Sequence, residues 1–155
     1  MSLEQEMATT GRINLIVGIS QRQYDLLCGI AEVACVGERD ILKESLKLYE
    51  YVAKKTVEGY TLLSDGKLID LDTIEPFSWG RQIIRRTFTS ALHQRLLELT
   101  TISEHKNYKE TVRKSYAVYK DLLVRVLQGS TVTCRSGGII ISISGDREVS
   151  LFGVE

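Results

Sequence analysis

The clearest pattern in the chain is RINLIVGI at residues 12–19, followed by Ser20 and a change of period. Leu15, Val17 and Ile19 alternate with residues of the opposite face, which is typical of a short strand with one buried side. Ser20 is a good helix N-cap, because its hydroxyl can accept a hydrogen bond from an amide in the first turn. The stretch therefore predicts a strand that passes directly into a helix.

Two helices and a hairpin are expected after this strand. Apolar residues recur at helical spacing from Gln21 until Val36-Gly37 breaks the pattern. A second apolar stripe begins near Glu38 and ends at Gly59, a favoured residue just beyond a helix C-terminus. Extended runs on either side of Asp65-Gly66 then predict a β-hairpin.

The same unit occurs again about 70 residues later. At an offset of 70, identities fall on a cap, a core position and a terminal glycine: Ser20 with Ser90, Tyr49 with Tyr119, and Gly59 with Gly129. The second hairpin turns at Gly137-Gly138, with one added residue. Each unit is too small to bury a large core alone, so we expect the copies to pack together.

This division predicts two repeats, at 12–71 and 81–155, joined by a linker at 72–80 and preceded by a flexible N-terminus at 1–11. A last strand is expected at 148–154. The linker holds the chain's single proline and single tryptophan, Pro76 and Trp79. We expect these to form a turn and a hydrophobic plug.

Composition is that of a folded protein. Of the 155 residues, 43% are hydrophobic, and no apolar run approaches the roughly 20 residues that cross a bilayer. The start of the chain is acidic and polar, unlike a secretory signal. Three cysteines without metal-ligand spacing favour a reducing cytoplasm. We therefore expect a cytoplasmic protein with no membrane contact.

The charge is balanced overall and uneven locally. Residues 81–125 carry ten basic and four acidic side chains, whereas residues 12–72 carry eight and ten. The two copies thus share a skeleton and differ in surface charge. Such a basic surface is typical of a nucleic-acid footprint, and it also occurs where basic residues serve solubility or contact with a partner protein.

A short strand, a capped helix, a tight turn and a second helix resemble the ribbon-helix-helix family of DNA-binding regulators, the MetJ/Arc type. The resemblance covers about residues 12–59 and 82–129 and rests on spacing. It implies an α+β fold of two β-α-α units, each followed here by a short β-hairpin, packed as a pseudo-two-fold pair. In that family the two strands form an antiparallel ribbon that enters the major groove of DNA.

The resemblance also implies which side chains face bases. In the first strand, Arg12 and Asn14 suit base edges, whereas Ile16 and Gly18 do not. At the strict offset of 70 the second strand would turn Arg85, Thr87 and Thr89 toward the core, which is costly. A slip of one residue inverts every side chain and buries Ile84 and Phe88 instead. We prefer that register, which predicts Arg85 and Thr87 as base-facing.

Phosphate contacts are expected at the start of the second helix of each unit, where free amides and the helix dipole attract anions. The second copy has Lys106 and Lys109 there, which we predict to contact phosphate. The first copy has Glu38 and Asp40, whose carboxylates would repel it.

An enzyme is not expected. The chain has two histidines, and neither lies at ligand spacing from a cysteine or a carboxylate. No phosphate-binding glycine loop, paired-histidine zinc motif or nucleophile elbow is present. We therefore predict no catalytic residue, no metal and no cofactor.

Two functions remain open. The chain is either a DNA-binding transcriptional regulator whose tandem copies stand in for the usual dimer, or a scaffold that has lost DNA binding and acts as a protein–protein adaptor through Ile16, Ile83 and the hairpins. The expected partners are accordingly duplex DNA, another protein, or a second copy of the chain through swapped repeats, because the linker allows pairing within one chain or between two.

Overall fold

The computed structural model describes residues 12–137 and 139–142, and it shows an α+β protein with four helices and two small antiparallel sheets. The N-terminus at 1–11 and the strand expected at 148–154 lie outside the described residues. The first repeat contains β1 (Arg12–Ile19), α2 (Gln21–Val33), α3 (Glu38–Val57), β2 (Thr61–Ser64) and β3 (Lys67–Leu68). After the short 3-10 helix η1 (Leu71–Thr73), the second contains β4 (Gln82–Thr89), α4 (Ser90–Ile102), α5 (Tyr108–Leu127), β5 (Val132–Ser136) and β6 (Ile139–Ser142).

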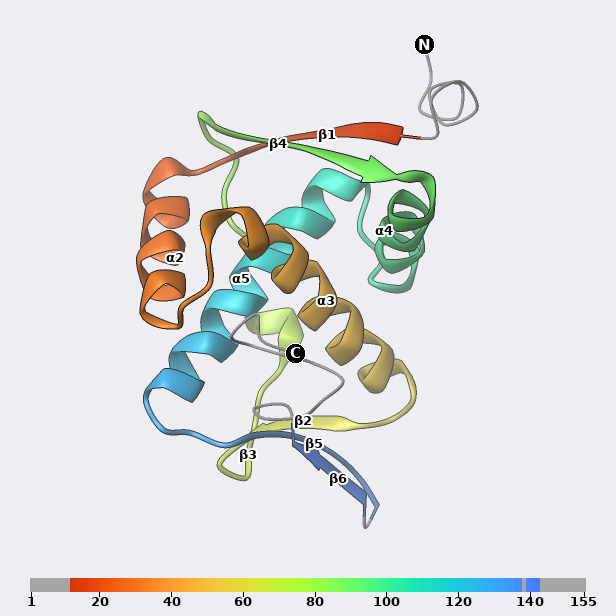
Figure 1. Ribbon diagram of the computed structural model, residues 1–155. Coiled ribbons are helices and arrows are strands. Elements are labelled where there is room, and N and C mark those ends of the chain that lie inside the picture. The colour runs from red at the N-terminus through yellow and green to blue at the C-terminus, as the bar shows by residue number, and fades with distance from the viewer. Residues whose placement is uncertain (1–11, 138, 143–155) are drawn as a thin grey trace.

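The strands of the two repeats pair with each other within one chain. β1 and β4 form a two-stranded antiparallel ribbon whose register runs from Arg12 opposite Thr89 to Ile19 opposite Gln82. The ribbon lies across one end of the helices (Figure 1). Its inner face packs on the shared core, where Leu15, Val17 and Ile84 are at most 2% exposed.

The hairpins form a second sheet at the opposite end of the helices (Figure 1). Both hairpins occur where the sequence predicts them, and β2 also pairs with β5, which gives the strand order β3-β2-β5-β6. This pairing of the two hairpins is not predicted from the sequence. α3 and α5 each run from the ribbon end to this sheet, so the two ends are connected by the two longest helices.

The slipped register predicted for the second strand is confirmed. In β4 the buried residues are Ile84 and Phe88, and Ile83, Arg85, Thr87 and Thr89 are exposed.

The cause of the slip is a displaced helix cap. Thr89 Oγ1 accepts from the Leu92 amide at 3.2 Å, as Ser20 Oγ accepts from the Gln23 amide at 3.4 Å. The equivalence of Ser20 with Ser90 is therefore wrong, because the residue equivalent to Ser20 is Thr89. The buried strand positions correspond at an offset of 69, because Leu15 and Ile19 match Ile84 and Phe88, and the first helices also begin 69 residues apart. A longer inter-helix turn restores 70 at α5.

The linker fills part of the core through Phe77, whereas the sequence predicts Trp79 in this role. Phe77 is 3% exposed and stacks on Tyr116 with ring centroids 5.9 Å apart. Trp79, expected to be the plug, is 74% exposed. Its indole nitrogen lies 3.4 Å from the place where a β-carbon on Gly18 would stand, so it covers the ribbon instead of entering the core.

No helix in the described residues has the length and apolar character needed to span a bilayer.

The close approach of the linker to β1 allows a stability test. A β-carbon on Gly80 would stand 2.5 Å from the Ile19 carbonyl oxygen and 2.6 Å from the Ser20 Cα. Because backbone atoms cannot move aside cheaply, we expect Gly80→Ala to lower the free energy of unfolding by about 1–3 kcal/mol in urea titrations.

Gly29→Ala is the matched control. Gly29 lies on the exposed side of α2, and its added β-carbon meets nothing within 4 Å. Alanine is the better helix former, so this variant is expected to gain about 0.5–1 kcal/mol. Equal effects of the two substitutions would contradict the close approach.

Candidate nucleic-acid interface

The ribbon brings the four predicted base-facing residues together on one exposed face. Asn14 lies opposite Thr87, and the Thr87 hydroxyl donates to Asn14 Oδ1 at 3.1 Å. Arg12 lies opposite Thr89 at one end of this face, and Arg85 lies near its centre, opposite Ile16. Their proposed contact with bases stays a prediction.

The outer face of the ribbon is polar at one end and apolar at the other. The polar end holds Arg12, Asn14 and Thr87. The apolar end holds the large exposed side chains Ile16, Ile83 and Trp79, which are 41%, 42% and 74% exposed. Ile83 and Trp79 both lie beside Gly18, within 3.6 Å of its would-be β-carbon, so they form one patch over the ribbon backbone.

The ribbon is tied to the helix beneath it by a basic side chain. Arg113 of α5 donates from Nε to the carbonyl oxygen of Gly18 at 3.1 Å. This bond satisfies a carbonyl of β1 and fixes α5 under the apolar end of the ribbon.

The N-terminus of α5 carries the predicted phosphate-contacting residues, Lys106 and Lys109, both exposed. Its first turn is already partly occupied by the chain's own side chains. Asn107 Oδ1 accepts from the Glu110 amide at 3.0 Å, and Glu110 Oε2 accepts from the Lys106 amide at 3.3 Å. An anion bound here would lie near Lys106 and Lys109, next to a turn that Asn107 and Glu110 already cap.

The N-terminus of α3 is more open than its sequence suggests. Its N-cap is Gly37, and no side chain caps it among the described residues. Glu38 is engaged elsewhere, because its Oε1 accepts from the Tyr24 hydroxyl at 3.2 Å. The amides of the first turn therefore donate no hydrogen bond to a capping side chain among the described residues. The acidic residues of this turn do not predict this opening.

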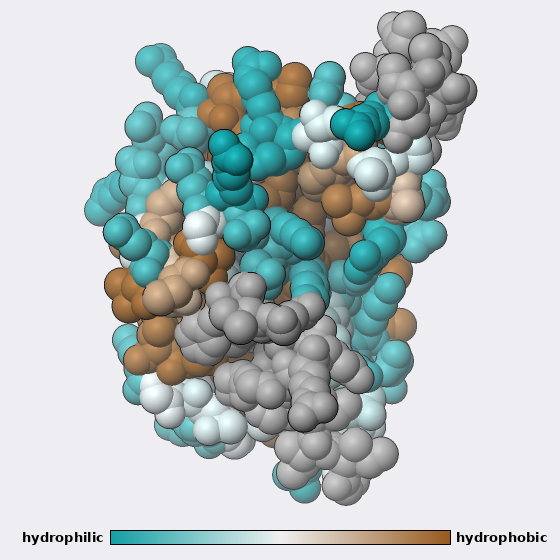
Figure 2. Space-filling view, viewed as in Figure 1, coloured by the Kyte–Doolittle hydropathy of each residue, from teal (hydrophilic) through white to brown (hydrophobic). Residues whose placement is uncertain are grey.

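A cleft of about 360 Å³ opens between β4, α3 and α4. Its floor is apolar, formed by buried side chains such as Leu42, Phe88 and Leu96. Figure 2 shows hydrophobic surface below the ribbon, between α3 and α4, with hydrophilic side chains around it. The rim of the cleft carries five basic side chains and one carboxylate: Arg39, Lys43, Lys47, Arg86, Arg95 and Glu50.

The charges of this cleft are only partly compensated within the described residues. Arg95 and Glu50 form an ion pair, and Arg86 donates to the Arg85 carbonyl oxygen at 2.7 Å. No ion pair among the described residues engages Arg39 or Lys43. The sequence contains a pattern that predicts the basic rim of the cleft. Arg39, Lys43 and Lys47 recur every four positions, which places them on one side of α3.

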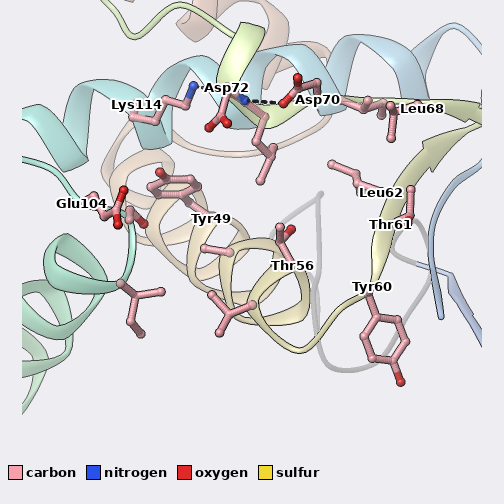
Figure 3. A pocket seen from close by; sticks show the side chains of 16 residues that line it. Tyr49, Thr56, Tyr60, Thr61, Leu62, Leu68, Asp70, Asp72, Glu104 and Lys114 are labelled. Atoms are coloured by element: carbon pink, nitrogen blue, oxygen red, sulfur yellow. Dashed lines mark hydrogen bonds between the residues drawn. The ribbon is translucent and has the colours of Figure 1, made fainter.

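A second hollow, of about 390 Å³, lies beside the first hairpin (Figure 3). Its polar groups serve the fold: Lys114 Nζ donates to the carbonyl oxygens of Leu71 and Ile74, and Asp70 accepts from the Asp72 amide at 3.0 Å. These bonds hold the linker against α5.

No group of three or more His, Cys, Asp or Glu side chains that could hold a metal ion occurs in the described part of the chain. A scan against family models and searches of curated proteins and of solved structures found no match to this chain.

The surroundings of the two histidines predict that stability depends on pH. His105, just before Lys106, hydrogen-bonds the Tyr49 hydroxyl at 2.9 Å. Its pKa is lowered by burial and by the Lys114 charge, against the opposing pull of Glu110. Burial also lowers the pKa of His93, which is 1% exposed and has no hydrogen-bond partner for either ring nitrogen among the described residues.

Both lowered pKa values mean that the folded state disfavours the imidazolium form. The free energy of unfolding should therefore be highest above the ordinary histidine pKa of about 6.5, and it should fall as the pH drops below that value. Urea titrations at pH 7.5 and 5.5 measure this fall. His93→Leu removes one proton-binding group, so it should reduce the fall in the free energy of unfolding between the two pH values. A fall as large as that of the unaltered protein would contradict the lowered pKa of His93.

Proposed function

We propose that the protein is a ribbon-helix-helix-like DNA-binding regulator in which the two repeats of one chain, related by a pseudo-two-fold axis, stand in for the usual dimer. The proposal depends on one observation: an exposed, two-stranded antiparallel ribbon made from both repeats, with Arg12, Asn14, Arg85 and Thr87 on its outer face. A ribbon of two strands fits the width of the major groove, and these side-chain types are suited to base edges.

The helix ends next to the ribbon support the proposal. α3 and α5 begin at the ribbon end of the molecule (Figure 1). In a major-groove complex such ends flank the groove, where amides and lysines meet phosphates. Lys106 and Lys109 are available at α5, and the amides of the first turn of α3 are not capped by a side chain.

The test is binding to duplex DNA. Selection from a pool of random duplexes at low salt supplies the preferred sequence, and fluorescence anisotropy then measures affinity as salt is raised. We expect affinity to fall steeply with salt, because phosphate contacts release counterions. Arg85→Ala should weaken binding to the selected sequence by about 1–3 kcal/mol, or roughly 5- to 150-fold.

Two variants separate the roles of the basic residues. Lys106→Ala should weaken binding to all sequences and lower the salt slope by about 1. Arg135 lies on β5, at the opposite end of the molecule, so Arg135→Ala should leave DNA binding unchanged. No enriched sequence and no binding at low salt would exclude the regulator.

The fluorescence of Trp79 reports on the outer face of the ribbon, since Trp79 is the chain's single tryptophan and lies on that face. When DNA covers the ribbon, acrylamide should quench Trp79 emission less than in the free protein. Binding that leaves Trp79 fully quenchable would place the DNA elsewhere.

The apolar end of the ribbon favours a second candidate, a protein-interaction module. Ile16, Ile83 and Trp79 form a patch that reads no base edge, and exposed apolar patches mark interaction surfaces. Under this candidate the protein does not bind duplex DNA at any salt concentration, so the same titration separates the two.

A further inference from the structure

The cationic cleft between α3 and α4 has a counterpart on the other side of the molecule that is already filled. Under the proposed pseudo-two-fold relation, α3 and α4 correspond to α5 and α2. Between α5 and α2 the linker residue Phe77 packs against Tyr116, whose equivalent in the open cleft is Leu46. One half of the molecule thus holds a bound segment where the other half holds an open cleft.

The filled side shows how the linker is held there. The Phe77 amide donates to the carbonyl oxygen of Arg113 at 3.1 Å, and the Ser78 amide donates to Gln23 Oε1 at 2.7 Å. The Ser20 amide donates to the Ser78 carbonyl oxygen at 2.7 Å. The segment is therefore fixed by its backbone and by one buried apolar side chain.

The linker precedes β4, and residues 1–11 precede β1, so the two segments occupy equivalent places in the repeat. Their sequences correspond at the offset of 69 that relates the strands. Residues 6–12 read EMATTGR and residues 75–81 read EPFSWGR, which match at Glu6 with Glu75, Gly11 with Gly80 and Arg12 with Arg81. The repeat therefore extends upstream of β1, into residues that lie outside the described part of the chain.

We propose that the N-terminal segment of the chain, residues 3–11, docks in the cleft between α3 and α4, with Met7 on the apolar floor and Glu4 and Glu6 against the basic rim. The segment has two acidic side chains and no basic one, whereas the rim has five basic side chains and one carboxylate. Opposite charges favour this pairing. At the offset of 69 Ala8 takes the position of Phe77, and the neighbouring Met7 supplies the larger apolar side chain whose burial favours docking.

The segment is long enough for this contact. Met7 lies five positions before Arg12, and an extended chain spans about 17 Å over five positions. The cleft begins at Phe88 and Thr87, and Thr89 pairs with Arg12 in the ribbon. The inference uses the pseudo-two-fold relation proposed above and is independent of DNA binding.

A disulfide in the full-length chain tests the contact. Met7→Cys is combined with Leu92→Cys, whose side chain lines the cleft, and the matched control combines Met7→Cys with Gln23→Cys. Gln23 is the equivalent of Leu92 in the filled half. After mild oxidation and proteolysis, mass spectrometry should find the 7–92 disulfide in most molecules and the 7–23 disulfide in few. Equal or absent crosslinking of both pairs would overturn the proposal.

A charge-reversal cycle covers the case in which Leu92→Cys prevents folding. Glu6→Lys and Lys43→Glu should each lower the Tm, and the double variant should recover most of the loss, because the reversed charges again attract. Additive losses would overturn the proposal and would leave the cleft to a ligand from outside the chain. Neither readout involves DNA, so failure of the regulator proposal would not change them.

Discussion

The antiparallel pairing of β1 with β4 determines how the two repeats assemble. It joins residues about 70 positions apart and places the first helices of the two repeats at opposite ends of the ribbon. α3 and α5 can then pack together beneath its inner face. Because neither repeat can bury its apolar strand face alone, the two repeats form one core.

The pairing also explains why the linker is closely packed. The chain reaches β4 through Gly80, which passes against the Ile19–Ser20 backbone with no room for a β-carbon. Just before it, Phe77 enters the core and Trp79 lies over the ribbon. Phe77 and Trp79 are thus only two positions apart, yet Phe77 stabilises the core and Trp79 adds an exposed aromatic side chain to the proposed interface.

Much of the fold could be read from local patterns. Alternation over residues 12–19, the cap at Ser20 and the glycines at 59 and 129 predict elements that the structure contains. The exposed positions of Arg85 and Thr87 follow from the cost of burying them. The precise offset could not be read from identities, because Ser90 and Thr89 are both good caps and only the burial of Ile84 and Phe88 separates them.

Residue types and their spacing along the chain are enough to predict the elements, their duplication and the polar residues at one end of the outer ribbon face. Which residues meet is known only from the folded chain: the pairing of β2 with β5, the burial of Phe77 instead of Trp79, and the cleft that joins the basic side of α3 to Arg86 and Arg95. These contacts depend on packing between distant segments, which no local period encodes.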